Sequence, residues 1–149
     1  MAMTMNGEVQ LAAPREVVWA KLNEAEVLKQ CIPGCESLEK TSDTEMKARV
    51  RLRIGPVSAT FGGKVTLSDI DPPNGYKISG EGEGGVAGFA KGGALVKLTE
   101  KDGGTLLSYD VEAQIGGKLA QLGQRLVQGT AKKLADDFFN KFAAAVTAG

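Results

Sequence analysis

The stretch EMKARVRLRIGPVSATFGGKVTLS, residues 45–68, decides the fold of this chain because its apolar and polar side chains alternate almost without interruption. Alternation with a period of two places the two sets of side chains on opposite faces of a β-strand. The turn at Gly55-Pro56 divides the stretch into two such runs. It therefore predicts two antiparallel strands with one apolar face and one wet face.

The same alternation extends along the chain in both directions and predicts an antiparallel meander. A strong turn at 71–75 and a second at 102–104 separate its later strands. Glycines crowd the segment from Gly80 to Gly93, where they predict either a sharp bend of the sheet or a mobile lid. Further strands are predicted over residues 3–11, 76–81, 94–99 and 107–115.

Helical periodicity appears in two places. Pro14 is the expected first residue of a short helix, and residues 24–30 can form another helical turn. From Gly116-Gly117 onward the pattern predicts one helix of about 30 residues, roughly 45 Å long. Its expected apolar side consists of Leu119, Leu122, Leu126, Thr130, Leu134, Phe138, Phe142 and Ala145.

This order of elements predicts one α+β domain over residues 1–149. We expect a helix-grip architecture, in which a curved antiparallel sheet of about seven strands wraps a long C-terminal helix, with two short helices after the first strand. Small residues would leave a space between sheet and helix that a ligand can occupy, because large voids are rare in protein interiors. The small residues in phase with the apolar face are Ala48, Ala59, Gly80, Gly82, Ala94 and Ala113.

Composition excludes several functions. The 18 basic residues equal the 18 acidic residues, so no overall field favours nucleic acid. The chain has no histidine, which removes the histidine-based catalytic and zinc mechanisms. We expect no metal and no cofactor. The polar N-terminus and the lack of a long apolar run predict a cytoplasmic protein, with membrane contact limited to peripheral binding at the inner face.

Four motifs resemble one known family over nearly the whole chain. They are Pro14–Trp19 (PREVVW), Cys31–Cys35 (CIPGC), Gly88–Gly92 (GFAKG) and Gly116–Gly123 (GGKLAQLG). Together they resemble the CoxG family of carbon monoxide dehydrogenase subunits, with the Cys-Ile-Pro-Gly-Cys block as the most specific of the four. The resemblance implies a START-like helix-grip fold, shared with lipid binders and polyketide cyclases. It also implies an accessory role in membrane recruitment of a carbon monoxide dehydrogenase type enzyme and contact with quinone.

We therefore expect a non-catalytic accessory subunit that binds a hydrophobic small molecule, lipid or quinone, in a central cavity. The alternative is a cavity enzyme of the polyketide cyclase or dehydratase type, with Tyr109 or Lys91 as its polar catalyst. The acidic pairs along the strands fall on the polar face, so no catalytic pair of carboxylates is expected.

Nine residues are candidates for contact with the ligand. Trp19 could stack on a ligand or belong to the core. Gly123 is expected in the middle of the last helix, where its cost of about 1 kcal/mol relative to alanine suggests close approach of a ligand or backbone. Phe89 is the bulky apolar residue of the glycine-rich segment. The full set is Trp19, Ile32, Pro33, Phe61, Phe89, Tyr109, Leu122, Gly123 and Leu126.

Two further features carry open alternatives. Lys47, Arg49, Arg51 and Arg53 place four cations on one face of a strand, either as a solvated face paired with neighbouring acids or as a docking stripe for an acidic partner or anionic head groups. Cys31 and Cys35 predict reduced, partly buried thiols that shape a loop, with a redox or disulfide role as the alternative.

Overall fold

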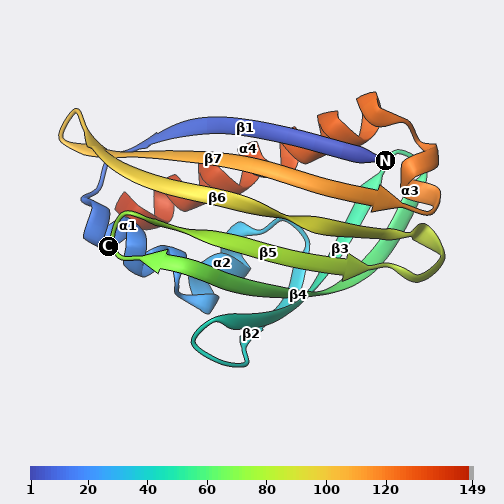
Figure 1. Ribbon diagram of the computed structural model, residues 1–149, viewed down its shortest axis with the longest axis horizontal. Helices are drawn as coiled ribbons and strands as arrows, with labels where there is room; N and C mark the ends of the chain where they lie inside the picture. Colours follow the sequence, from blue (N-terminus) through green and yellow to red (C-terminus); the bar gives the residue numbers. More distant parts are fainter. Residues whose placement is uncertain (148–149) are drawn as a thin grey trace.

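The structure is a computed structural model that describes residues 1–147; the last two residues of the expected domain, 148 and 149, lie outside the described part. Seven strands form one antiparallel sheet, and a long helix packs along one face of it (Figure 1). The strands are β1 (Ala2–Leu11), β2 (Cys35–Lys40), β3 (Glu45–Ile54), β4 (Val57–Asp71), β5 (Gly75–Glu83), β6 (Phe89–Lys101) and β7 (Gly104–Gly116). The helices are α1 (Arg15–Leu22), α2 (Ala25–Cys31), α3 (Lys118–Gln121) and α4 (Gln124–Thr147), with a 3₁₀ turn η1 (Gly85–Ala87). The predicted α+β class and sheet are confirmed.

The sheet order is β1-β7-β6-β5-β4-β3-β2, so β1 and β2 form its two edges. Helices α1 and α2 carry the chain from the first edge to the other, and the meander then returns strand by strand until β7 pairs with β1. We call the sheet face toward α4 the inner face and the opposite one the outer face. Within residues 1–147, no helix combines the length and the apolar character needed to cross a bilayer.

The apolar core consists of two separate clusters. The α1–α2 cluster joins α1 and α2 to the C-terminal half of α4, and its central residues Leu11, Val18, Leu107 and Phe142 are almost completely buried. The α3 cluster lies at the other end of α4 and contains Met3, Ile54, Ile115, Leu119 and Val127. Each large side chain buried in this way stabilises the fold by roughly 1.5–3 kcal/mol. Helix α4 is therefore held to the sheet at both of its ends.

Two strands differ from the sequence prediction. The short edge strand β2 was not expected, because residues 35–40 alternate only weakly and carry two glutamates. Strand β6 begins at Phe89 rather than at Ala94, so half of the glycine-rich segment pairs regularly with β5 and β7. Glycines lack the side chains that reveal alternation, and cross-strand pairing replaces that signal in the folded chain.

The last helix also differs from the prediction, because it breaks at Gly123. This residue has a φ of +92°, which separates α3 from α4. A Cβ atom at Gly123 would meet no atom within 4 Å. The glycine therefore serves the backbone turn, and the inferred close approach of a ligand or backbone is wrong.

We predict opposite effects on stability from alanine at two neighbouring glycines. Gly123→Ala should destabilise the fold by about 1–2 kcal/mol, because an L-residue resists a left-handed backbone. Gly129→Ala, inside α4 with equally open space around its Cβ, should stabilise it by about 0.5–1 kcal/mol. Urea unfolding of both variants measures the difference. A gain in stability from both substitutions would show that the helix does not break at Gly123.

Candidate functional site

The middle of the inner face is covered almost entirely by glycine and alanine. One row of directly paired residues crosses four strands as Ala48, Gly63, Gly82 and Ala90. The neighbouring row contains Gly80, Gly92 and Ala113. The small residues predicted to face the helix therefore lie side by side, and they form a shallow floor between the two core clusters.

Apolar side chains around this floor remain partly exposed although they face α4. Val50, Leu52, Ala94 and Val111 are only half-buried, and neither described core cluster includes them. Leu134, on the middle of α4, shows the same behaviour. A solidly packed interior would bury these residues. The interior space between sheet and helix is therefore open to solvent between its two packed ends.

An aromatic wall bounds this interior space beside the α1–α2 cluster. The ring of Tyr109 on β7 stacks on Phe139 of α4, with ring centroids 5.2 Å apart. Phe138 in turn stacks on Phe142 at 5.7 Å. The Tyr109 hydroxyl lies directly over Gly7 of β1, where a Cβ atom would be only 2.5 Å from it. The tyrosine is thus fixed between an edge strand and the helix.

Three other predicted ligand residues lie in the packed ends of the interior. Phe61 and Leu122 pack against the α3 cluster. Trp19 packs in the α1–α2 cluster with its ring edge against Tyr76, at a centroid distance of 5.3 Å. Burial raises the pKa of Tyr76 to about 12, so its hydroxyl stays neutral. Trp19 therefore has the core position that was one of its two expected roles.

The remaining candidates do not meet at this space. Phe89 lies on the outer face, where its ring covers Gly116. Leu126 is 39% exposed and contacts the β3–β4 turn at Gly55. Ile32 and Pro33 are half-buried in the link from α2 to β2, and Gly123 faces open space. The structure thus brings Phe61, Leu122 and Tyr109 to the interior and places these residues elsewhere.

Sequence reasoning missed several residues around the interior space. Phe139 follows Phe138 directly, and a simple helical face accommodates only one of the two. Val50, Leu52 and Val111 were recognised as inward-facing but not as ligand contacts. Their alternation was the available signal, whereas their incomplete burial depends on the distance between sheet and helix.

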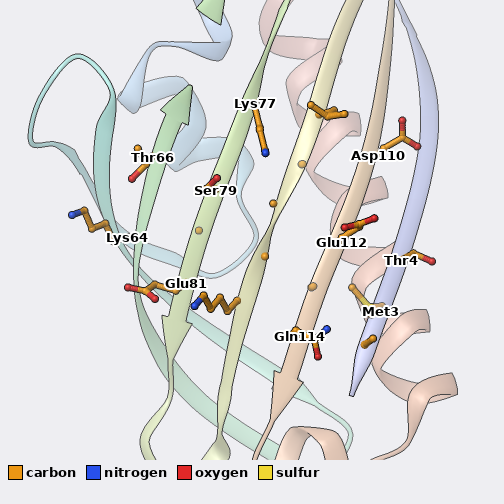
Figure 2. Close-up of a pocket in the computed structure, with 18 residues that line it drawn as sticks. Met3, Thr4, Lys64, Thr66, Lys77, Ser79, Glu81, Asp110, Glu112 and Gln114 are labelled. Atoms are coloured by element: carbon orange, nitrogen blue, oxygen red, sulfur yellow. The ribbon is translucent and has the colours of Figure 1, made fainter. Parts of the chain in front are cut away.

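A groove of about 1060 Å³ lies on the outer face, away from α4 (Figure 2). Charged side chains of both signs line it, among them Lys64, Lys77, Glu81 and Glu112. Lys64 forms an ion pair with Glu45 at 3.4 Å. Lys91 also lines this outer groove, so it does not reach the interior in which its catalytic role was considered.

The four cations of β3 are exposed on the outer face. Lys47 lies opposite Glu39 of β2, and Arg49, Arg51 and Arg53 lie opposite Gly62, Thr60 and Ser58 of β4. Among the described residues none of the four forms an ion pair. The expected pairing with neighbouring acids is therefore absent from this part of the chain, and the strand presents uncompensated positive charge.

Both cysteines are free thiols. Cys31 is buried, and Cys35 donates a hydrogen bond to the Ser37 carbonyl at 3.4 Å. Burial raises the pKa of each thiol, so both stay protonated at neutral pH and are poor nucleophiles. In residues 1–147 no three cysteine or carboxylate side chains gather as a metal site would require.

Solved structures with this architecture share the fold across wide sequence distances. A conserved protein from Geobacillus kaustophilus is 37% identical, with a TM-score of 0.92 over 98% of this chain and 96% of its own. The ZhuI aromatase/cyclase of a Streptomyces species is 13% identical, with a TM-score of 0.72 over 99% and 94%. Ara h 8.0201 is 17% identical, with a TM-score of 0.70 over the full length of both chains. The last two show the fold alone.

The family comparison covers nearly all of the chain. No functionally curated protein matches it. The family model of CoxG, a carbon monoxide dehydrogenase subunit, matches residues 7–147, a range that contains the floor, the aromatic wall and both core clusters. With the helix-grip architecture and this match together, the chain belongs to the CoxG family of carbon monoxide dehydrogenase subunits.

Proposed function

We propose that this protein is a non-catalytic accessory subunit of a carbon monoxide dehydrogenase type system, which binds a lipid or quinone and aids recruitment of the enzyme to the membrane. The observation that carries the proposal is the open interior between the two core clusters. Its floor is glycine and alanine, and its half-buried surroundings are aliphatic. Such a surface gains free energy by covering apolar ligand atoms, at about 25 cal/mol per Å² removed from water.

The chemistry of the interior supports binding rather than catalysis. The carboxylates Asp110 and Glu112 are exposed on the outer face, and Lys91 lines the outer groove. Tyr109 brings a hydroxyl to the interior side, but Gly7 and Phe139 hold that side chain in place. A catalytic acid or base must reach the reacting atoms of its substrate. The interior therefore fits a ligand that is held by shape and apolar contact.

Filling the interior should abolish ligand binding without unfolding the protein. Ala94 faces the interior and Leu95, its neighbour, faces outward, so the pair provides a matched test. Ala94→Phe should weaken binding of the apolar probe 1-anilinonaphthalene-8-sulfonate at least about tenfold, or roughly 1.4 kcal/mol. Leu95→Phe should leave binding unchanged. Fluorescence titration of delipidated protein measures both affinities.

The stability of the same variant provides the control. An open interior accepts the phenylalanine with little loss of stability, whereas a filled core would lose about 1–3 kcal/mol by overpacking. Native mass spectrometry of protein purified without delipidation should detect a bound lipid or quinone. Unchanged probe affinity in a folded Ala94→Phe variant would contradict the proposed site.

We assign the cationic strand β3 to contact with an acidic surface of the dehydrogenase. Its outer face is flat and polar, because Ser58, Thr60 and Gly62 are the cross-strand neighbours of the arginines. Among residues 1–147, none of the exposed large apolar side chains lies on β3. A flat cationic face suits electrostatic docking to a protein, since complementary charge mainly raises the association rate and fixes orientation.

Charge reversal on this strand should weaken binding to the dehydrogenase and lower its dependence on salt. The test variant is Arg49→Glu with Arg51→Glu. Lys97→Glu with Lys101→Glu, two exposed positions of β6, changes the net charge equally and is the control. We expect an association rate at least about tenfold lower for the arginine variant in low salt. Equal losses for both variants in surface plasmon resonance would show that net charge, rather than β3, determines binding.

The cyclase alternative makes a separate prediction for Tyr109. Tyr109→Phe keeps the stack on Phe139 and removes only the hydroxyl, so a binding protein should retain its affinity for the apolar probe. The measurement is probe affinity together with turnover of an aromatic polyketide substrate. Turnover by the native chain that disappears in Tyr109→Phe would establish the enzyme and refute the non-catalytic role.

A further inference from the structure

One end of the molecule gathers three loops that carry exposed apolar side chains. Because the strands form an antiparallel meander, the β3–β4 turn, η1 and the link from β7 to α4 all lie at the same end (Figure 1). We call this the η1 end. The hairpins β4–β5 and β6–β7 lie at the opposite end, as does the β2–β3 turn.

Three of the five exposed large apolar residues in the described chain are at the η1 end. Val86 is 84% exposed, Phe89 46% and Leu126 39%. Scattered single apolar residues are normal on a protein surface, whereas a group of them marks an interaction site. Val86 stands at the tip of η1 and contributes almost nothing to the core.

Close backbone contacts hold these loops together. Gly88 packs directly on Gly116 and Gly117, and α3 contacts η1. The ring of Phe89 covers Gly116, while Leu126 covers Gly55 in the β3–β4 turn. The three apolar side chains therefore come from one joined surface.

The charges at the two ends of the molecule have opposite signs. The η1 end carries Arg53, Lys91, Lys118 and Arg125 against the carboxylate of Glu83. The chain as a whole has equal numbers of basic and acidic residues, so this excess is local. Acids predominate in the turns of the opposite end, which contain Asp43, Glu45, Asp69, Asp71, Glu100 and Asp102.

We propose that the η1 end is a membrane-docking surface that inserts Val86, with Phe89 and Leu126 beside it, into an anionic lipid bilayer. The surrounding cations meet the lipid phosphates, and each basic side chain near an anionic surface adds about 1 kcal/mol of attraction. The acidic opposite end is repelled by the same surface, so the charge separation orients the molecule with η1 toward the lipid.

A bilayer fits this end better than a protein partner does. The apolar side chains project from turns at the tip, and cations flank them, which is the arrangement that interfacial binding requires. The location also deepens the proposed recruitment and carrier role, on which its biological meaning rests. Phe61, beside the interior space, lies directly beneath Gly84 at the start of η1. Docking would therefore bring the lipid against the segment that covers the interior.

The test is cosedimentation of the full chain with vesicles. The native protein should bind phosphatidylglycerol/phosphatidylcholine vesicles and should bind phosphatidylcholine alone at least about tenfold more weakly, because the head-group attraction is lost. Val86→Asp should lower affinity for the anionic vesicles at least about tenfold. Lys118→Glu with Arg125→Glu should do the same, and added salt should weaken the native interaction. Val86 is so exposed that its variant should unfold at the same urea concentration as the native chain.

Leu95→Asp and Ile70→Asp are the matched controls, because these residues are 47% and 42% exposed but lie outside the η1 end. Both should bind the vesicles as the native chain does. Equal loss from Leu95→Asp and Val86→Asp, or no vesicle binding by the native chain, would overturn the membrane assignment. The apolar probe titration separates the two proposals, because Val86→Asp should keep native probe affinity and Ala94→Phe should keep vesicle binding. Loss of dehydrogenase binding by Val86→Asp with unchanged vesicle binding would reassign this end to the partner protein and overturn the inference.

Discussion

One helix has to cover the apolar face of a seven-stranded sheet, and it meets that requirement by packing at its two ends. Phe142 and Val146 anchor the C-terminal half of α4 against α1, α2 and β7, while Val127 anchors the first turns beside Leu119. The middle of the helix faces strands whose inner residues are glycine and alanine. A helix held at both ends cannot approach that floor more closely, because the large side chains at the ends set the distance. The interior space follows from this difference in side-chain size along the sheet.

The same arrangement separates the chemistry of the two sheet faces. Alternation places the carboxylates and lysines of the strands on the outer face, where water solvates them. The inner face retains aliphatic, glycine and aromatic residues, and the buried hydroxyl of Tyr76 stays neutral because burial raises its pKa to about 12. Selection of a ligand inside such a space depends on its shape and its apolar area. Interactions that depend on charge are restricted to the outside, at β3 and at the η1 end.

Regular alternation predicted the strands well wherever side chains were large enough to reveal it. Residues 45–54 and 57–68 lie in β3 and β4 as expected, and Trp19 and Phe142 belong to the core. The prediction failed where the deciding quantity was the backbone. Gly123 looked like a costly residue within a helix, yet its positive φ ends α3 before α4 begins. A sequence gives the identity of a glycine but not its φ, so the break required coordinates.

The position of Phe89 shows how a missing phase changes a functional interpretation. Treated as part of a glycine-rich loop, Phe89 had no assigned face, and a gate over the interior was a reasonable hypothesis. Extending the β6 pairing from Ala94 back through Gly92 and Ala90 assigns the even positions to the inner face and Phe89 to the outer one. The residue then joins Val86 as an exposed apolar group instead of lining the interior. Which face a residue occupies follows from counting along a strand, but the strand must first be recognised, and five residues with two glycines and no alternation hide it.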